Sequence, residues 1–284
     1  MNPENVARVV CRLPLDTLLV DGIETALTNP ETGVLLIEFY SRLDSERMEV
    51  DQILAGGPLI GRLRGLLRKM EVGPKPIVAL ISESLGGLQL EIALACHARL
   101  TPSQTIKLGF PWLKYGLMPI LGGTQRLPRL VGIGLAARML LQCESVAAAE
   151  LAASGLIELA DHRLAEAALD WAKAHPEPKQ PWDLTPQELS PSYAQTSSNR
   201  LILENIYLKL RRRVSPEEAA PTAILKCLQD GLERSIDAGL RLEAEHWSLV
   251  RHSPSTLNRL QTLHGARQKA IRTAIDQSVS IKCL

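Results

Sequence analysis

Residues 84–100 read SLGGLQLEIALACHARL and residues 109–129 read GFPWLKYGLMPILGGTQRLPR, and these two stretches decide the fold. The first places one carboxylate, Glu91, inside an otherwise apolar helix that begins directly after Gly86 and Gly87. Burying a charged carboxylate is costly, so we expect the pKa of Glu91 to rise and the group to become available for proton transfer. The glycine turn lets backbone N–H groups approach a ligand at the helix N-terminus, where partial positive charge favours an oxyanion. This combination suits chemistry on a carbonyl compound.

Outward from these stretches, buried strands and helices alternate along the chain. Apolar runs predict strands at 9–19, 33–39 and 77–81, with shorter candidates at 99–101 and 105–108. Apolar spacing predicts a further helix after the glycine pair at 122–123, and helices at 23–29, 58–70, 88–96 and 134–141. This alternation is typical of an α/β fold with largely buried strands.

The composition changes near residue 175. Prolines recur between 175 and 198, which indicates a linker. Beyond it, three mainly helical stretches with little strand signal are predicted, at 199–213, 216–251 and 254–277. We therefore divide the chain into a core at 1–195 and a helical C-terminal region at 196–284.

Composition and charge exclude several classes of protein. The 284 residues carry 32 basic and 31 acidic side chains, so no basic surplus favours nucleic acid or a membrane surface. The five cysteines are scattered without the spacing of a metal site, and no metal is expected. The N-terminus carries charges where a signal peptide has its apolar stretch, and no apolar run is long enough for a membrane span. We expect a cytoplasmic protein with reduced cysteines.

The quoted stretches resemble the core signature of the crotonase superfamily, the enoyl-CoA hydratase/isomerase proteins. The likeness is clearest from Lys75 to Asp161, and the block GGTQRLPRLVG at 122–132 is specific. The segment APTAILKCLQDGLERSIDAGLRLEAEHWSLV at 220–250 is similar to the segment that follows the hydratase domain of bifunctional fatty-acid oxidation enzymes. Those enzymes also carry a dehydrogenase, for which we expect no counterpart in these 284 residues.

The resemblance implies a spiral of ββα units that acts on an acyl-CoA thioester and needs no other cofactor. In the family, two backbone N–H groups polarise the thioester carbonyl, and in the hydratases two glutamates position and activate water. By this likeness Gly86 and Gly87 supply one side of the oxyanion hole, and Leu88 and Trp112 contact the substrate. Relatives form trimers or hexamers, so a homo-oligomer is expected, and the helical tail could also hold a partner protein.

The position of the first family glutamate depends on how the likeness is anchored. Anchored on ALACHAR at 93–99, the glutamate maps to Glu91; anchored on the Leu85-Gly86-Gly87 turn, Leu90 takes its place. A shift of one residue rotates a helical side chain by about 100°. We favour Glu91, because the other register leaves its carboxylate unpaired elsewhere in an apolar helix.

Two features depart from the family pattern. The Pro-Glu dipeptide that carries the second glutamate is here Pro111-Trp112, and an indole cannot carry a proton to or from carbon. The nearest replacement, Lys114, lies two residues further on. The family's Gly-Ala-Asp turn after an early core strand is replaced by the glycine-free segment YSRLDSERMEVDQ at 40–52, where a backbone donor near Arg47 or Met48 would have to stand in.

Each candidate residue also has a structural interpretation. Glu91 could be a buried glutamate paired with Arg99 or Arg126 instead of an acid/base. Trp112 could fill the pocket instead of forming an aromatic wall for a flat acyl group. His97 is expected to be a structural histidine.

Two functions from different classes remain open. One is a divergent enzyme that uses Glu91 and the Gly86-Gly87 turn for hydration, dehydration or a single-base enolate step. The other is a non-catalytic paralogue that keeps the fold for ligand binding or protein assembly. Trp112, the missing glycine turn and the helical tail favour the second; acyl-CoA turnover would favour the first.

Overall fold

The computed structural model describes residues 5–41, 45–55, 57–160, 163–184, 197–213, 215 and 217–263. At its centre lies a five-stranded parallel sheet, in the order β1 (Val6–Cys11), β2 (Val34–Phe39), β3 (Ile77–Ile81), β5 (Ala98–Thr101) and β8 (Glu158–Leu159). A smaller sheet joins β4 (Leu85–Gly86), β6 (Lys107–Gly109) and β7 (Val146–Ala147). The predicted α/β fold class is confirmed.

Helices pack around the large sheet and make up the described part of the C-terminal region apart from the short turns that join them. They are α1 (Thr17–Thr28), α2 (Ser45–Ala55), α3 (Pro58–Val72), α4 (Gly87–Leu94), α5 (Gly123–Val131), α6 (Ile133–Leu141), α7 (Ala148–Ala153), α8 (Leu164–Ala174), α9 (Ser197–Arg213), α10 (Ala219–Leu232) and α11 (Ile236–Val250). Two short 3-10 helices, η1 (Trp112–Tyr115) and η2 (Pro181–Asp183), and a helical stretch at 254–263 complete the elements. None of the helices described is long and apolar enough to cross a membrane.

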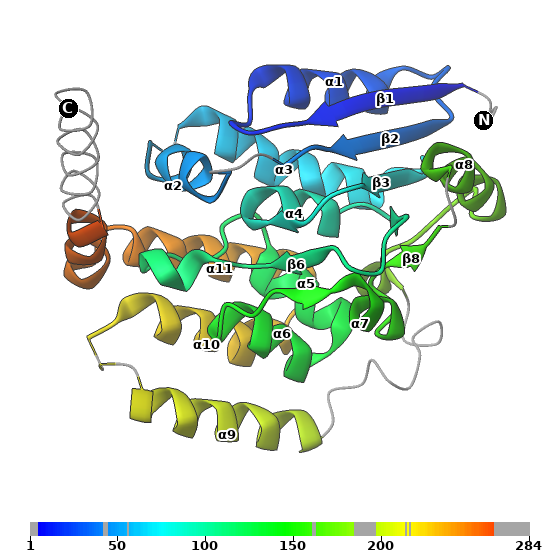
Figure 1. Cartoon of the computed structure of the whole chain (residues 1–284). Coiled ribbons are helices and arrows are strands. Elements are labelled where there is room, and N and C mark those ends of the chain that lie inside the picture. Colours follow the sequence, from blue (N-terminus) through cyan, green and yellow to red (C-terminus); the bar gives the residue numbers. More distant parts are fainter. Residues whose placement is uncertain are drawn as a thin grey trace, which may run out of the picture.

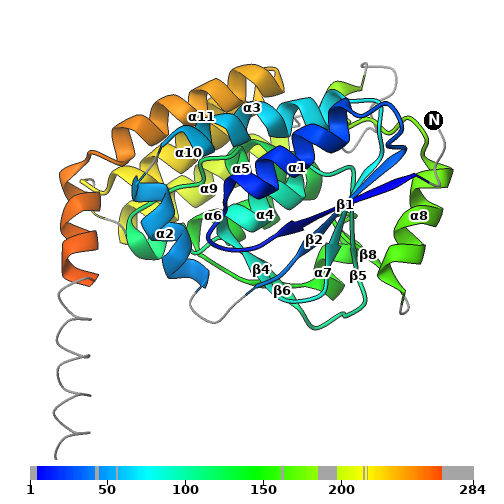
Figure 2. The ribbon, with the colours of Figure 1, turned by 90° about the horizontal axis from the view of Figure 1, so that it is seen from above.

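The central strands β2 and β3 are buried on both faces of the large sheet, and each contributes to two cores. Leu35 and Ile37 of β2 belong to the main core, whereas Leu36 between them packs in a second cluster with α8. This follows from the period of two in a strand, which sends successive side chains to opposite faces. Figure 2 shows α8 on one side of the sheet and α1, α3 and α4 on the other. The continuous apolar runs of β2 and β3 are therefore explained by burial on both sides.

The predicted end of the first strand is wrong. The strand expected at 9–19 ends at Cys11, because Pro14 has no N–H to give to a neighbouring strand. Asp16 then caps α1 by accepting a hydrogen bond from the backbone nitrogen of Leu19 at 3.1 Å. The helix therefore begins well before the expected start at residue 23.

Two further differences concern the helices. No helix was expected at 45–55, where the sequence lacks a clear apolar stripe, yet α2 forms there. The stretch expected to be continuous at 216–251 is two helices, and Ser235 caps the second by accepting a hydrogen bond from the backbone nitrogen of Ala238 at 3.4 Å. The proposed division between residues 195 and 196, and the predicted helix beyond residue 263, lie outside the described residues.

The C-terminal helices pack directly on the core. Helix α10 contacts α5 and α6, α11 contacts α5, and α9 contacts α6. Figure 1 shows α10 and α11 beside α5 and α6. Ile224, Leu228 and Trp247 of this region belong to the same buried cluster as the core helices. Helix α5 consequently lies between α4 and α11, and this arrangement forms the site described next.

Candidate active site

The site begins at the start of α4, where the chain turns from β4 into the helix. Gly86 is extended and Gly87 has a φ of +53°, a conformation that favours glycine. A Cβ atom on Gly87 would lie 2.7 Å from the carboxyl carbon of Glu49 and 2.7 Å from Cζ2 of Trp112. Only a glycine leaves room for these two side chains, so this turn is packed closely against Glu49 and Trp112.

Glu91 lies one helical turn further on and is completely buried. Its Oε1 accepts a hydrogen bond from the backbone nitrogen of Ile120 at 3.2 Å, and its Oε2 accepts from the nitrogens of Leu121 at 2.6 Å and Gly123 at 2.9 Å. These nitrogens lead into the N-terminus of α5, whose N–H groups have no acceptor within the helix. Glu91 therefore joins α4 to the start of α5.

A second buried carboxylate, Glu243 of α11, binds the same helix start. Its Oε1 accepts from the nitrogen of Gly122 at 2.6 Å, and its Oε2 accepts from the nitrogen and hydroxyl of Thr124 at 2.9 and 2.5 Å. The N-terminus of α5 thus holds two carboxylates, one from the core and one from the tail. A helix N-terminus favours negative charge, which helps to offset the cost of burying both groups.

The two carboxylates influence each other's ionisation. Burial, and then the nearby charge of Glu243, raise the pKa of Glu91 from 4.5 to about 8, whereas the three backbone hydrogen bonds act in the opposite direction. Burial also raises the pKa of Glu243. The pKa of Glu91 is therefore close to neutrality, which is where an acid/base group is most useful. This direction agrees with the expectation from the apolar helix around Glu91.

The suggested arginine partners of Glu91 are wrong. Arg126 pairs with Glu71 through Nε and Oε1 at 2.5 Å, and also donates from Nη1 to the carbonyl oxygen of Leu121. Arg99 donates to backbone carbonyl oxygens, at 2.8 Å to that of Leu156 and 2.6 Å to that of Cys96. Both guanidinium groups are buried, but each has other acceptors, and Glu91 is satisfied by backbone N–H groups instead.

Glu49 of α2 occupies the region where the family pattern has its glycine turn. Its Oε1 accepts a hydrogen bond from the backbone nitrogen of Gln89 at 3.2 Å, and its carboxylate lies against Gly87. Arg47 and Met48, the expected source of a backbone donor, lie in the first turn of α2. The segment therefore brings a carboxylate to the start of α4.

Trp112 follows Pro111 in η1 and is 1% exposed. Its indole N–H is buried without a hydrogen-bond partner among the described residues. The ring edge lies beside Gly87 and the Glu49 carboxylate, so it fills space at the start of α4. This packing supports the pocket-filling interpretation over an open aromatic wall. Lys114, the nearest basic residue to it, is exposed.

Leu88, Leu90 and His97 take structural positions. Leu88 and Leu90 are buried in the main apolar core. The Nδ1 of His97 accepts a hydrogen bond from the backbone nitrogen of Ile77 at 3.1 Å, and its Nε2 lies 3.3 Å from the carbonyl oxygen of Glu71. Burial lowers the pKa of His97 to about 4, so the neutral ring is maintained. These contacts support the structural interpretation of His97.

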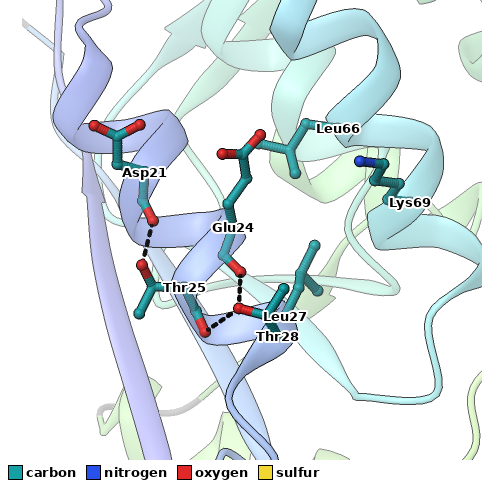
Figure 3. A pocket seen from close by; sticks show the side chains of 7 residues that line it. All are labelled: Asp21, Glu24, Thr25, Leu27, Thr28, Leu66 and Lys69. Atoms are coloured by element: carbon teal, nitrogen blue, oxygen red, sulfur yellow. Dashed lines mark hydrogen bonds between the residues drawn. The ribbon is translucent and has the colours of Figure 1, made fainter.

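Two cavities lie away from Glu91 and Gly87. One, of about 560 Å³, lies between α1 and α3, and Figure 3 shows its lining: Asp21, Glu24, Thr25, Leu27, Thr28, Leu66 and Lys69. The hydroxyls of Thr25 and Thr28 donate to carbonyl oxygens of α1 itself. The other, of about 170 Å³, lies at the ends of β2 and β3 beside α8. Among the residues described, no group of three or more His, Cys, Asp or Glu side chains could hold a metal ion.

The sequence offered Glu91 and the Gly86-Gly87 turn as candidates, and it did not single out Glu49 or Glu243, which the structure brings to the same region. Glu49 lies in a helix that the sequence did not reveal, and Glu243 lies 121 positions from Gly122, whose nitrogen it binds. One signal was present for Glu243: a lone glutamate among the apolar positions of a helix, as for Glu91. The spacing of residues within α11 does not indicate which helix N-terminus the Glu243 carboxylate binds.

The fold and this site together define a class: an α/β protein of the crotonase fold, with a carboxylate buried behind a glycine turn. The solved structure of an enoyl-CoA hydratase/isomerase from Pseudoalteromonas atlantica matches with a TM-score of 0.58 over 94% of this chain and 95% of that chain. Its sequence identity is 18%, so the match shows the fold. Residues 56–181 match the family model described as Enoyl-CoA hydratase/isomerase.

Relatives identified by sequence agree. The chain is 34% identical over 175 residues to the fatty acid oxidation complex subunit alpha of Shewanella loihica, covering 61% of this chain and 25% of that protein. It is 36% identical over 186 residues to the glyoxysomal fatty acid beta-oxidation multifunctional protein MFP-a of Brassica napus, covering 64% and 25%. The chain spans about a quarter of the length of these curated relatives. These matches agree with the resemblance to the enoyl-CoA hydratase/isomerase proteins that the sequence shows.

Proposed function

We propose that this chain binds an acyl-CoA thioester at the start of α4 and carries out hydratase/isomerase-type chemistry with Glu91 as its acid/base. One observation carries the proposal: the start of α4 already holds an anionic oxygen, because the nitrogen of Gln89 donates to the Glu49 carboxylate beside Gly87. A helix start that binds a carboxylate oxygen is suited to the negative oxygen that develops on a thioester. The family and the matched hydratase/isomerase support the same substrate class.

Glu91 keeps one acceptor position for chemistry. The two oxygens of a carboxylate offer about four acceptor positions, and three are taken by backbone N–H groups. The remaining position belongs to Oε1, which accepts only the 3.2 Å hydrogen bond from Ile120. With a pKa of about 8, Glu91 can hold or release a proton near neutral pH. Coenzyme A enters this proposal as part of the substrate, and no other cofactor is invoked.

The test is hydration of crotonyl-CoA, followed by loss of the conjugated thioester absorbance. We expect Glu91→Gln to lose turnover at least a hundredfold, because general acid–base catalysis contributes about that much or more. Glu243→Gln is the matched control, since it removes a second buried carboxylate from the same helix start. If turnover falls equally in both variants, Glu91 has only a structural role at the N-terminus of α5. If turnover is unaffected in Glu91→Gln, Glu91 is not the acid/base.

A second candidate function is a non-catalytic paralogue that binds a ligand or a protein. It is favoured by Trp112, which occupies the family position of the second glutamate and packs into the start of α4. Calorimetry with the unreactive butyryl-CoA separates the candidates. Binding without turnover of crotonyl-CoA or of an aromatic enoyl-CoA would support a binding role, and absence of binding would support assembly.

We further propose that the chain forms a cytoplasmic homo-oligomer or holds a partner protein on its C-terminal helices. Large apolar side chains are exposed along α9, namely Leu201, Ile202 and Leu208. Such side chains are enriched where another surface covers them. The mass of the purified protein by light scattering, compared with Leu201→Lys, tests the proposal. A wild-type monomer that captures no partner would reject it.

A further inference from the structure

We propose that Glu49 is an internal anion that occupies the oxyanion site of α4, so that an acyl thioester binds only after the Glu49 carboxylate leaves. This inference rests on the proposed function, since it concerns access to the same site. It also identifies a residue that controls ligand affinity without taking part in proton transfer.

The carboxylate of Glu49 lies where a ligand oxygen would bind. Its Oε1 is 3.2 Å from the nitrogen of Gln89, one of the first N–H groups of α4, which have no acceptor within the helix. Its Oε2 and carboxyl carbon lie against Gly87, on the side where any Cβ atom would collide with them. A carboxylate oxygen resembles the negative oxygen of an enolate in charge and size. Glu49 and a thioester oxygen therefore compete for one place.

Trp112 closes the same space from another element. Its Cζ2 would lie 2.7 Å from a Cβ on Gly87. The ring edge of Trp112 and the Glu49 carboxylate therefore both lie against the same side of Gly87. Both side chains are buried, and Glu49 is 2% exposed. The start of α4 is therefore filled by one side chain from α2 and one from η1. A thioester cannot reach the N–H groups while both remain in place.

The side chain of Glu49, and not the whole of α2, is the part expected to move. Helix α2 contacts α4, as Figure 1 shows, and Val50 and Ile53 bury its apolar side. Gln52 fixes the helix further: its Oε1 accepts from the nitrogen of Leu15 at 2.8 Å, and its Nε2 donates to the Leu15 carbonyl oxygen. Rotation about the Glu49 side-chain bonds opens the site without breaking these contacts.

The experiment measures binding of butyryl-CoA by calorimetry to the wild type, Glu49→Ala, Glu49→Gln and the control Asp51→Asn. Asp51 is an exposed carboxylate on the same helix, so its variant removes one negative charge from α2 and leaves Glu49 in place. Apparent affinity falls in proportion to the fraction of molecules whose site is open. We expect Glu49→Ala to bind at least about tenfold more tightly than the wild type, which corresponds to a wild-type site open in at most about a tenth of molecules. Glu49→Gln keeps an oxygen for Gln89 but loses the charge, so we expect an intermediate affinity.

Each alternative outcome is distinct. Equal or weaker binding by both Glu49 variants, with binding by the wild type, overturns this inference and leaves the proposed function standing. If Glu49→Gln loses turnover while its affinity for butyryl-CoA is unchanged, Glu49 takes part in proton transfer. That result also overturns this inference. No binding by any of the four proteins rejects the proposed function, and this inference with it. Amide exchange at residue 89 gives a readout without CoA: exchange that is not faster in Glu49→Ala, which removes the acceptor, shows that Glu49 does not hold this site.

Discussion

The buried pair Glu91 and Glu243 predicts that the protein loses stability as the pH rises above 6.5. The pKa of Glu91 is about 8 in the folded chain against 4.5 for an ordinary glutamate. Between these two values the folded state keeps a proton that the unfolded state has lost. Stability therefore decreases with pH in this window, by about 1.4 kcal/mol for each pH unit.

The window from pH 6.5 to 8 isolates this effect from the histidines. Burial lowers the pKa of His97 from 6.5 to about 4, so the stability that neutral His97 contributes is complete above pH 6.5 and is lost as the pH falls toward 4. Burial lowers the pKa of His246 as well, with the same sign. Above pH 6.5 the Glu91 contribution remains, and we expect it to cost about 1.6 kcal/mol by pH 8, where Glu91 of the folded chain is half ionised.

The assay is urea denaturation at pH 6.5, 7.0, 7.5 and 8.0, for the wild type and two variants. Glu91→Gln should reduce the pH dependence, because it removes one of the two buried carboxylates whose pKa is raised and leaves the contribution of Glu243. Glu243→Gln should make it shallower, because it removes the second of the two causes that raise the pKa of Glu91. The exposed Glu31→Gln is the control and should keep the wild-type slope. A stability that is constant or increases from pH 6.5 to 8, or a slope unchanged in Glu91→Gln, refutes the reasoning.

Three further predictions concern buried side chains, each tested by the urea midpoint against the wild type. Trp112→Ala should cost about 3–5 kcal/mol, because it leaves a large cavity at the start of α4, and a loss below 1 kcal/mol, on the order of an exposed site, would contradict the packing. Arg126→Met should cost about 1.5–3 kcal/mol, because the buried Glu71 loses this partner and keeps only the 3.3 Å contact with Arg68; adding Glu71→Gln should recover part of the loss, and an additive second loss would show the pair is not coupled. Lys75→Met should cost about 1.5–3 kcal/mol, because the Nζ of Lys75 donates to three carbonyl oxygens at the end of α1, and an unchanged midpoint would show that water replaces them.

The local pattern of the sequence was sufficient for the fold class. The apolar runs of β2 and β3 and the glycine pair before α4 indicate buried strands alternating with helices, and the structure has them at nearly the expected positions. Helix α2 was missed because tertiary contact with α4 stabilises it, and its own sequence has no strong helical period. The first strand was predicted too long because its apolar residues continue past Pro14 into the helix.

The sequence by itself determined that Glu91 is buried near a glycine turn, because a single charge among apolar residues at helical spacing has no exposed face to occupy. Only the tertiary structure decided what that carboxylate meets. Its partners are backbone N–H groups about 30 positions away, with Glu243 of the tail beside them, and Glu49 of α2 fills the turn itself. The physical reason is that spacing within one element fixes which face a side chain takes, whereas the packing of several elements fixes which charges converge.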